Sequence, residues 1–150
     1  MKFLIPIDGS ESSEHALAKA LIFATPLQAE IVLLTVVEPL SNYIPEVMMP
    51  TGEWVGWRGL PDAELERKIL GAGQALLQKA QDTCQASGLE SRTRLEIGQP
   101  RDLICTVAKE ENPDLLILGS RGLGSIERLM LGSVSDYVLH HCLSPVLVVR

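Results

Sequence analysis

The chain has 150 residues, 46% of them hydrophobic, and a formal net charge of −6 at pH 7. This length is typical of one domain with a sizeable core, so we expect a single domain over residues 1–150. The acidic balance and the absence of a basic run argue against nucleic acids and anionic membrane surfaces as partners. The apolar start of the chain is too short to cross a membrane, and no signal peptide is recognisable.

The first part of the chain alternates between apolar runs and helical patterns. Residues 2–7 predict a buried strand, and Asp8-Gly9-Ser10 predicts a turn in which Ser10 caps the following helix. That helix is expected to stop at Thr25-Pro26. Residues 30–37 are rich in Ile, Leu and Val without alternation, which is typical of a parallel strand covered by helices on both faces.

Residues 39–61 differ from the rest of the chain, with four prolines, three glycines and both tryptophans, Trp54 and Trp57. A loop of about 20 residues is uncommon in a compact domain and tends to be functional or disordered. Its aromatic residues argue against disorder. We interpret this segment as a variable insertion packed on its own domain. A flap near a ligand and a dimer contact are the alternatives.

The next part of the chain continues the alternation of helices and strands. Asp62 is expected to cap a helix that ends at Ser87-Gly88. Residues 91–97 alternate between polar and apolar side chains, which predicts a half-exposed strand at a sheet edge. Pro100 begins a further helix that ends at Asn112-Pro113. The predicted buried stripe of the helix after Asp62 is Leu65, Ile69, Ala72, Leu76, Ala80 and Cys84.

A glycine-rich segment follows the strand predicted at residues 114–118, with glycines at 119, 122, 124 and 132. Ser133 is expected to cap a helix over about residues 134–141, with Asp136 as its capping-box partner. Glycines let backbone N–H groups approach a phosphate, and a helix N-terminus adds unpaired N–H groups and a positive dipole end. This order therefore favours anion binding, against the alternative that the glycines only form turns. Neither a dinucleotide fingerprint nor a Walker loop is present.

Together with a last strand at residues 146–149, these patterns predict an α/β domain with a parallel sheet. Four segments in order resemble the universal stress protein family, and the resemblance covers the whole chain. They are Ile5-Pro6-Ile7-Asp8-Gly9-Ser10, residues 33–37, the spacing Gly119-x-x-Gly122 then nine residues then Gly132-Ser133, and residues 145–150. The third of them resembles the family's ATP-binding signature.

The resemblance implies an open parallel five-stranded sheet in the order 3-2-1-4-5, with helices on both faces. This is a Rossmann-like fold of the adenine nucleotide alpha hydrolase type. Its order reverses between the first and fourth strands, which creates a crevice at their carboxyl ends. Asp8 and Gly119 end these two strands, so we expect both to lie at that crevice.

The resemblance also implies the residues of an ATP site, or of an AMP or ADP site, with or without Mg²⁺. The adenine is expected at Pro6, Asp8 and Val36, although Asp8 alone would cap a helix and the other two would be core residues. A Mg²⁺ ion would rest mainly on phosphates and water, with Asp8 as a candidate ligand. Arg121 and Arg128 are candidate cations for phosphate, against an ordinary surface role. The remaining expected contacts are Leu118, Gly119, Ser120, Arg121, Gly122, Leu123, Gly124, Ser125, Gly132, Ser133, Val134 and Ser135.

The cysteines and histidines do not predict a further site. Cys84, Cys105 and Cys142 are odd in number, far apart and without a Cys-x-x-Cys pair, as in reduced core residues of a cytoplasmic protein. His140 and His141 precede Cys142, but adjacent residues on a helix point about 100° apart and cannot readily share one metal ion. We expect these histidines to act as cations at a helix end.

The resemblance implies an ATP- or AMP-binding protein of stress response or signalling that forms a homodimer through strand 146–149. A slow ATP hydrolase is the first alternative. It has little support, because the chain has no Walker lysine, no dense carboxylate pair for two metals and no Ser-Gly-Gly-x-Asp loop of the related pyrophosphatases. A nucleotide-free dimeric interaction module is the second alternative, and the glycine signature counts against it. No catalytic residue is predicted.

Overall fold

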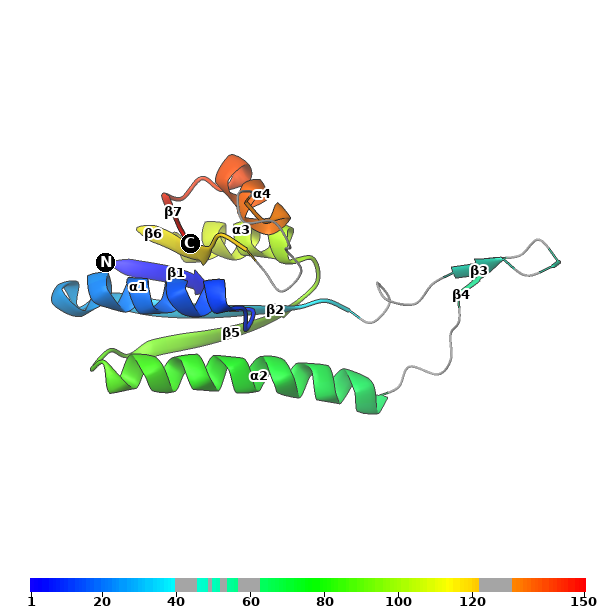
Figure 1. The fold of residues 1–150 in the computed structure, drawn as a ribbon, viewed down its shortest axis with the longest axis horizontal. Coiled ribbons are helices and arrows are strands. Elements are labelled where there is room, and N and C mark those ends of the chain that lie inside the picture. Colours follow the sequence, from blue (N-terminus) through cyan, green and yellow to red (C-terminus); the bar gives the residue numbers. More distant parts are fainter. Residues whose placement is uncertain (40–45, 49, 52–53, 57–62, 122–130) are drawn as a thin grey trace.

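The computed structural model describes residues 1–39, 46–48, 50–51, 54–56, 63–121 and 131–150. Its centre is a parallel five-stranded sheet in the order β5-β2-β1-β6-β7 (Figure 1). When the strands of this sheet alone are numbered along the chain, their order is 3-2-1-4-5, which confirms the expected order. The strands are β1 (Lys2–Pro6), β2 (Glu30–Val37), β5 (Ser91–Ile97), β6 (Leu115–Gly119) and β7 (Val146–Val149). The helices are α1 (Glu11–Leu27), α2 (Ala63–Ala86), α3 (Pro100–Glu111) and α4 (Ser133–His141). No helix among these described residues is long and apolar enough to cross a membrane.

Helices cover both faces of the sheet because successive strand residues point to opposite sides. In β1, Phe3 and Ile5 pack with residues of α1 and α2, whereas Leu4 packs with residues of α3 and α4. These three side chains are at most 1% exposed. The unbroken apolar pattern of the central strands therefore reflects burial on both faces.

Helix α1 is longer than its sequence pattern predicts. We expected a stop at Thr25-Pro26, but the helix runs to Leu27 with Pro26 in its last turn. Gln28 then adopts a left-handed conformation with a φ of 45° and caps the helix. Proline cannot donate a backbone hydrogen bond, yet its fixed φ is compatible with a helix. The helix therefore tolerates Pro26 at its end and stops only at the left-handed Gln28.

Helix α2 buries a face that differs in part from the predicted stripe. Leu65 is 42% exposed and Ala72 is also exposed, which corrects their predicted burial. A Cβ added at Gly73 would lie 2.8 Å from Leu95 Cδ1 and 3.0 Å from Val37 Cγ2. The absent side chain of Gly73 therefore allows α2 to approach β2 and β5 closely. The buried residues of α2 are Gly73, Leu77, Ala80 and Cys84.

The proline-rich segment contains a short hairpin that the sequence pattern does not predict. Strands β3 (Glu46–Met48) and β4 (Trp54–Gly56) pair in antiparallel register, with Met48 opposite Trp54. Figure 1 shows this hairpin away from the five-stranded sheet. Trp57 and the predicted helix cap Asp62 lie outside the described residues.

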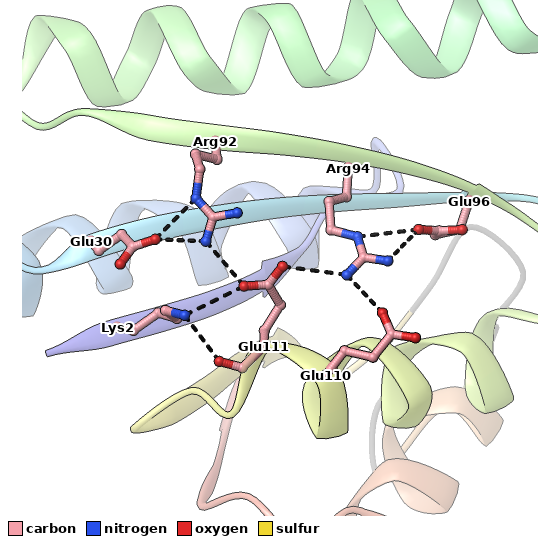
Figure 2. A network of polar contacts seen from close by, with 7 residues as sticks. All are labelled: Lys2, Glu30, Arg92, Arg94, Glu96, Glu110 and Glu111. Carbon is pink, nitrogen blue, oxygen red and sulfur yellow. Dashed lines mark hydrogen bonds and ion pairs between the residues drawn. The ribbon is translucent and has the colours of Figure 1, made fainter.

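A network of seven charged residues fastens the end of α3 to the sheet (Figure 2). At its centre, the Glu111 carboxylate lies 3.0 Å from Arg92 Nη2, 3.3 Å from Arg94 Nη1 and 3.5 Å from Lys2 Nζ. Burial opposes ionisation of Glu111, but the hydrogen bond and charge of Arg92, with help from Arg94 and Lys2, lower its pKa. The network therefore holds the last turn of α3 against β1, β2 and β5. The other members are Glu30, Glu96 and Glu110.

Candidate functional site

The loops after β1 and β6 meet at the carboxyl edge of the sheet. The two strands are hydrogen-bonded neighbours, with Leu4 opposite Leu116. The chain winds away from them in opposite directions, since β2 and β5 lie on one side and β7 on the other. Open α/β sheets bind ligands at such a reversal. The predicted juxtaposition of the Asp8 loop and the Gly119 loop is therefore present in the fold.

Asp8 braces the residue that caps α1. Its Oδ1 accepts hydrogen bonds from Ser10 N at 2.9 Å and from Ser10 Oγ at 2.6 Å. Ser10 Oγ in turn accepts a hydrogen bond of 3.1 Å from Ser13 N, which confirms Ser10 as the N-cap. Asp8 itself is exposed at the end of β1. The Asp8 carboxylate is thus fixed in orientation at this edge of the sheet while its side chain remains accessible.

Gly119 is required by close packing at the end of β6. A Cβ at this position would lie 2.5 Å from Ser12 Oγ and 2.6 Å from the Ser12 carbonyl carbon and oxygen. Such distances do not occur for real side chains, and backbone atoms cannot move aside as a flexible side chain would. Gly119 therefore lets the end of β6 contact the first turn of α1.

Hydrogen bonds continue from Gly119 into the loop that follows it. Ser120 is buried, and its N–H donates a hydrogen bond of 2.7 Å to the carbonyl of Val149 in β7. The N–H of Arg121 donates to Ser12 Oγ at 3.3 Å, and Ser10 Oγ lies 3.3 Å from the Arg121 carbonyl oxygen. The loop after β6 is therefore joined both to the start of α1 and to the neighbouring strand.

The side chain of Arg121 has one buried nitrogen that needs a partner. Among the described residues, none is hydrogen-bonded to Arg121 Nε, although this atom is buried. A buried donor without a partner costs about 1–3 kcal/mol, and more when it is charged. The guanidinium presents its donors in a planar fork that matches phosphate and carboxylate oxygens. Arg121 is therefore suited to an anion at this edge of the sheet.

Helix α4 begins one residue earlier than we predicted. Its N-cap is Gly132, and Ser133 is the first helical residue, so the predicted capping box of Ser133 with Asp136 is wrong. Gly132 is held by two bonds: its N–H donates to Ser120 O at 2.8 Å, and its carbonyl accepts from Asp136 N at 2.9 Å. The bond that Gly132 donates to the Ser120 carbonyl fixes Gly132 as the last extended residue. It leaves Ser133 exposed at the first turn of the helix.

Ser135 joins α4 to β6. The residue is 3% exposed, and its hydroxyl donates a hydrogen bond of 2.7 Å to the carbonyl of Gly119. The start of α4 is consequently positioned against the strand end that the signature glycine occupies. The N–H groups of its first turn lie at the same edge of the sheet as the Arg121 loop.

Four of the predicted binding residues belong wholly or partly to the framework of the sheet. Leu118 is buried in the cluster between the sheet, α3 and α4, and Val36 and Val134 are half-buried against it. Pro6 is half-buried at the end of β1, opposite Leu34. Leu118 is therefore a core residue beneath this edge of the sheet, while the other three are partly accessible.

The remaining predicted residues of this region lie outside the described residues. These are Gly122, Leu123, Gly124 and Ser125 of the glycine loop, and Arg128. One residue that the sequence did not single out is Ser12, which contacts both Gly119 and Arg121. Its position in the first turn of a helix after the aspartate was the available signal. In the sequence, Ser12 is indistinguishable from an ordinary helix residue, because its contacts with Gly119 and Arg121 depend on the fold.

The histidines at the end of α4 have local partners. His140 Nδ1 lies 2.7 Å from the Asp136 carbonyl oxygen, and His141 Nδ1 lies 2.8 Å from that of Tyr137. The His141 ring also stacks on Tyr137, with centroids 3.9 Å apart. No group of three or more His, Cys, Asp or Glu residues in the described part of the chain could hold a metal ion.

Comparisons with known proteins agree on one family. The family model described as the universal stress protein family matches residues 1–150. Universal stress protein YxiE of Bacillus subtilis is 32% identical over 99% of this chain and 98% of its own. Among solved structures, universal stress protein UspA from Lactobacillus plantarum superposes with a TM-score of 0.80 at 25% identity, over 100% of this chain and 97% of that one. A universal stress protein in complex with cAMP superposes with a TM-score of 0.71 at 26% identity, over the same shares.

Proposed function

The chain belongs to the universal stress protein family, and we propose on this basis that it binds an adenine nucleotide at the carboxyl ends of β1 and β6. ATP is the ligand we propose, with AMP or ADP as the related forms. The solved relative with cAMP bound supports an adenine nucleotide as the class of ligand. We propose that the protein acts in stress response or signalling in the cytoplasm.

One observation carries this proposal furthest, namely the arrangement around Arg121. Its Nε is buried and has no hydrogen-bond partner among the described residues, while its backbone is held by Ser12 and Ser10. The carbonyl of the neighbouring Ser120 also fixes Gly132 at the start of α4. A phosphate at this position would pair with the guanidinium and with N–H groups of the first turn of α4. The excess negative charge of the whole chain makes such local donors necessary.

We propose distinct contacts for the three parts of the nucleotide. The adenine ring would lie against Pro6 and Val36, with the fixed carboxylate of Asp8 available to its amino group. The ribose and phosphates would contact the loop that begins at Gly119. The phosphates would also contact residues 132–135, through backbone N–H groups and the exposed Ser133 hydroxyl. A Mg²⁺ ion would be held mainly by the phosphates and water, with Asp8 as its candidate protein ligand.

We further propose a homodimer through β7. This strand forms one edge of the sheet and has the sequence Val-Leu-Val-Val, with its first three residues half-buried in the single chain. An apolar edge strand invites pairing with another chain unless it is covered. Pairing of β7 with the same strand of a second copy would cover both edges by a two-fold axis.

The direct test is to identify what the purified protein carries and what it binds afterwards. The protein is denatured, and the released small molecules are identified by chromatography and mass spectrometry. Refolded, nucleotide-free protein is then titrated with ATP, ADP, AMP and cAMP. Recovery of an adenine nucleotide, or saturable binding of one of the four, would support the proposal. No recovery together with no binding would reject it and favour the nucleotide-free interaction module.

A further inference from the structure

Two cysteines that are 37 positions apart in the sequence lie in contact on the α3/α4 side of the sheet. Cys105 belongs to α3, and Cys142 is the C-cap of α4. Their Sγ atoms are 2.7 Å apart, and both residues are half-buried. The sequence predicted reduced core cysteines, and all three are free thiols in the structure, but it did not predict this contact. Cys84 is fully buried in the cluster on the other face of the sheet.

We propose that Cys105 and Cys142 are an oxidation site, at which a hydroperoxide converts the two thiols into a reversible disulfide within one chain. A disulfide needs sulfurs about 2.05 Å apart. The present separation of 2.7 Å requires only a small adjustment of the side chains. The proposal stands on the contact between the two cysteines and does not depend on nucleotide binding.

Contacts other than the one between the sulfurs also hold α3 and α4 together. The Arg101 guanidinium of α3 lies over the Tyr137 ring of α4, 5.1 Å from its centroid. The N–H of Cys142 donates a hydrogen bond of 2.9 Å to the Val138 carbonyl, which closes the last turn of α4 and fixes the Cys142 backbone. Both cysteines also pack against the core cluster on this face.

The pair borders a surface pocket, through which a small oxidant can approach. The pocket has a volume of about 400 Å³, and its lining includes Cys105, Lys109, His141 and Cys142. Cys84, with no exposed surface, has no comparable access.

The two sulfurs have different roles in the proposed reaction. Burial, followed by the contact with Cys105, raises the pKa of Cys142. It donates its S–H to the Cys105 sulfur. We therefore assign the attack on the oxidant to Cys105 and the second step to Cys142.

The reaction balances with one hydroperoxide per disulfide. Cys105 loses its proton and attacks the peroxide, so that an S–O bond forms, the O–O bond breaks, and water or an alcohol leaves with the proton. The Cys142 sulfur then attacks the sulfenic acid of Cys105. The S–S bond forms, the S–O bond breaks, and the Cys142 proton leaves with the hydroxyl as water. The two sulfurs together lose two electrons, which the peroxide gains.

The test maps the bond in the full-length protein. Reduced protein is treated with one equivalent of hydrogen peroxide, remaining thiols are alkylated, and the tryptic fragments are analysed without reductant. We expect fragment 102–109 joined to fragment 129–150 with the loss of two hydrogens, while Cys84 is alkylated. Dithiothreitol should restore both thiols. The Cys84→Ala variant should form the same bond, because its substitution lies on the other face of the sheet.

Single variants separate the two roles. Cys142→Ser should leave Cys105 as a sulfenic acid that a dimedone probe traps, and Cys105→Ser should leave Cys142 as a thiol. The proposal would be overturned if both cysteines of the wild-type protein were alkylated after peroxide treatment. It would equally be overturned if each became a separate sulfinic acid, or if the only disulfides joined two chains. These outcomes are read from the wild-type protein and do not require any variant to fold.

Discussion

The hydroxyl of Ser135 donates a hydrogen bond of 2.7 Å to the carbonyl oxygen of Gly119 and thereby joins the first turn of α4 to the end of β6. Both groups are buried. The two segments that carry the signature glycines of this chain, 119 and 132, are consequently held in one arrangement by contacts within the protein itself. A site that is organised in advance loses less free energy on binding.

Ser135→Ala should mainly lower stability, whereas Ser133→Ala should mainly weaken ATP binding. Ser135→Ala leaves a buried carbonyl without its partner and should reduce the free energy of unfolding by about 1–3 kcal/mol. Ser133 is exposed and does not cap the helix, so Ser133→Ala should change stability by less than about 0.5 kcal/mol. Loss of its proposed bond to phosphate, worth about 1.5–3 kcal/mol, should weaken ATP binding about 10- to 150-fold.

Urea unfolding and calorimetric titration of both variants measure these effects. A large loss of stability in Ser133→Ala would indicate that Ser133 caps α4, in contrast to the N-cap at Gly132 in the structure. Unchanged ATP affinity in a folded Ser133→Ala protein would remove this hydroxyl from the binding site.

Gly119→Ala should destabilise the protein and prevent nucleotide binding. The new Cβ would meet the Ser12 backbone at 2.6 Å, and overpacking of this kind typically costs about 1–3 kcal/mol. Gly71→Ala is the matched control, because a Cβ there has nothing within 4 Å and lies in a helix. It should stabilise the protein by about 0.5–1 kcal/mol. Thermal unfolding should give a lower melting temperature for Gly119→Ala than for Gly71→Ala. Equal melting temperatures would contradict the close packing at Gly119.

The Glu111 network should make stability depend on pH. Because its neighbours lower the pKa of Glu111, the contribution of this carboxylate is complete above the ordinary glutamate pKa and is lost as the pH falls through the lower value in the folded state. Glu111→Gln should therefore cost about 1–3 kcal/mol at pH 7 and much less near pH 3. Glu14→Gln, which removes an exposed pair with Lys79, should have a much smaller effect, because exposed ion pairs contribute little to stability. A Glu111→Gln deficit that stayed constant from pH 7 to pH 3 would exclude this electrostatic account.

A charge in β7 should disrupt the proposed dimer. Val148→Asp places a carboxylate on an edge strand that would face a second copy, so light scattering should report monomer or aggregate in place of a dimer. Because Val148 also packs on its own core, circular dichroism must show that the variant is folded. Ile97→Asp is the control, since Ile97 is 58% exposed on β5 at the opposite edge of the sheet. A folded Val148→Asp dimer would place the interface elsewhere.

Local signals in the sequence predicted most helix boundaries correctly. Ser10 caps α1, Pro100 opens α3, and Asn112 ends α3 in a left-handed conformation, each as expected. These boundaries depend on one or two residues and their own dihedral preferences. The sheet order needed the family resemblance, because periodicity identifies strands but does not state which strands are neighbours.

Several features that the sequence did not predict depend on contacts between distant parts of the chain. Gly132 displaces Ser133 as the N-cap of α4 because Ser120 holds its N–H. Ser12 joined the candidate site only because the fold places it against Gly119. Cys105 and Cys142 belong to two helices whose packing brings their sulfurs together. No periodicity or capping rule contains such contacts.

Calorimetric titration of nucleotide-free protein with ATP, comparing the wild type with Gly132→Val, tests nucleotide binding most directly. Gly132 has a φ of −66° and a ψ of 154°, an extended conformation that valine adopts readily. The variant should therefore keep its α/β circular dichroism spectrum, while its branched side chain occupies the space proposed for phosphate. We predict saturable ATP binding by the wild type and none by the folded variant. Equal ATP affinity of the two proteins would contradict the proposed phosphate site and leave the glycine loop as a turn.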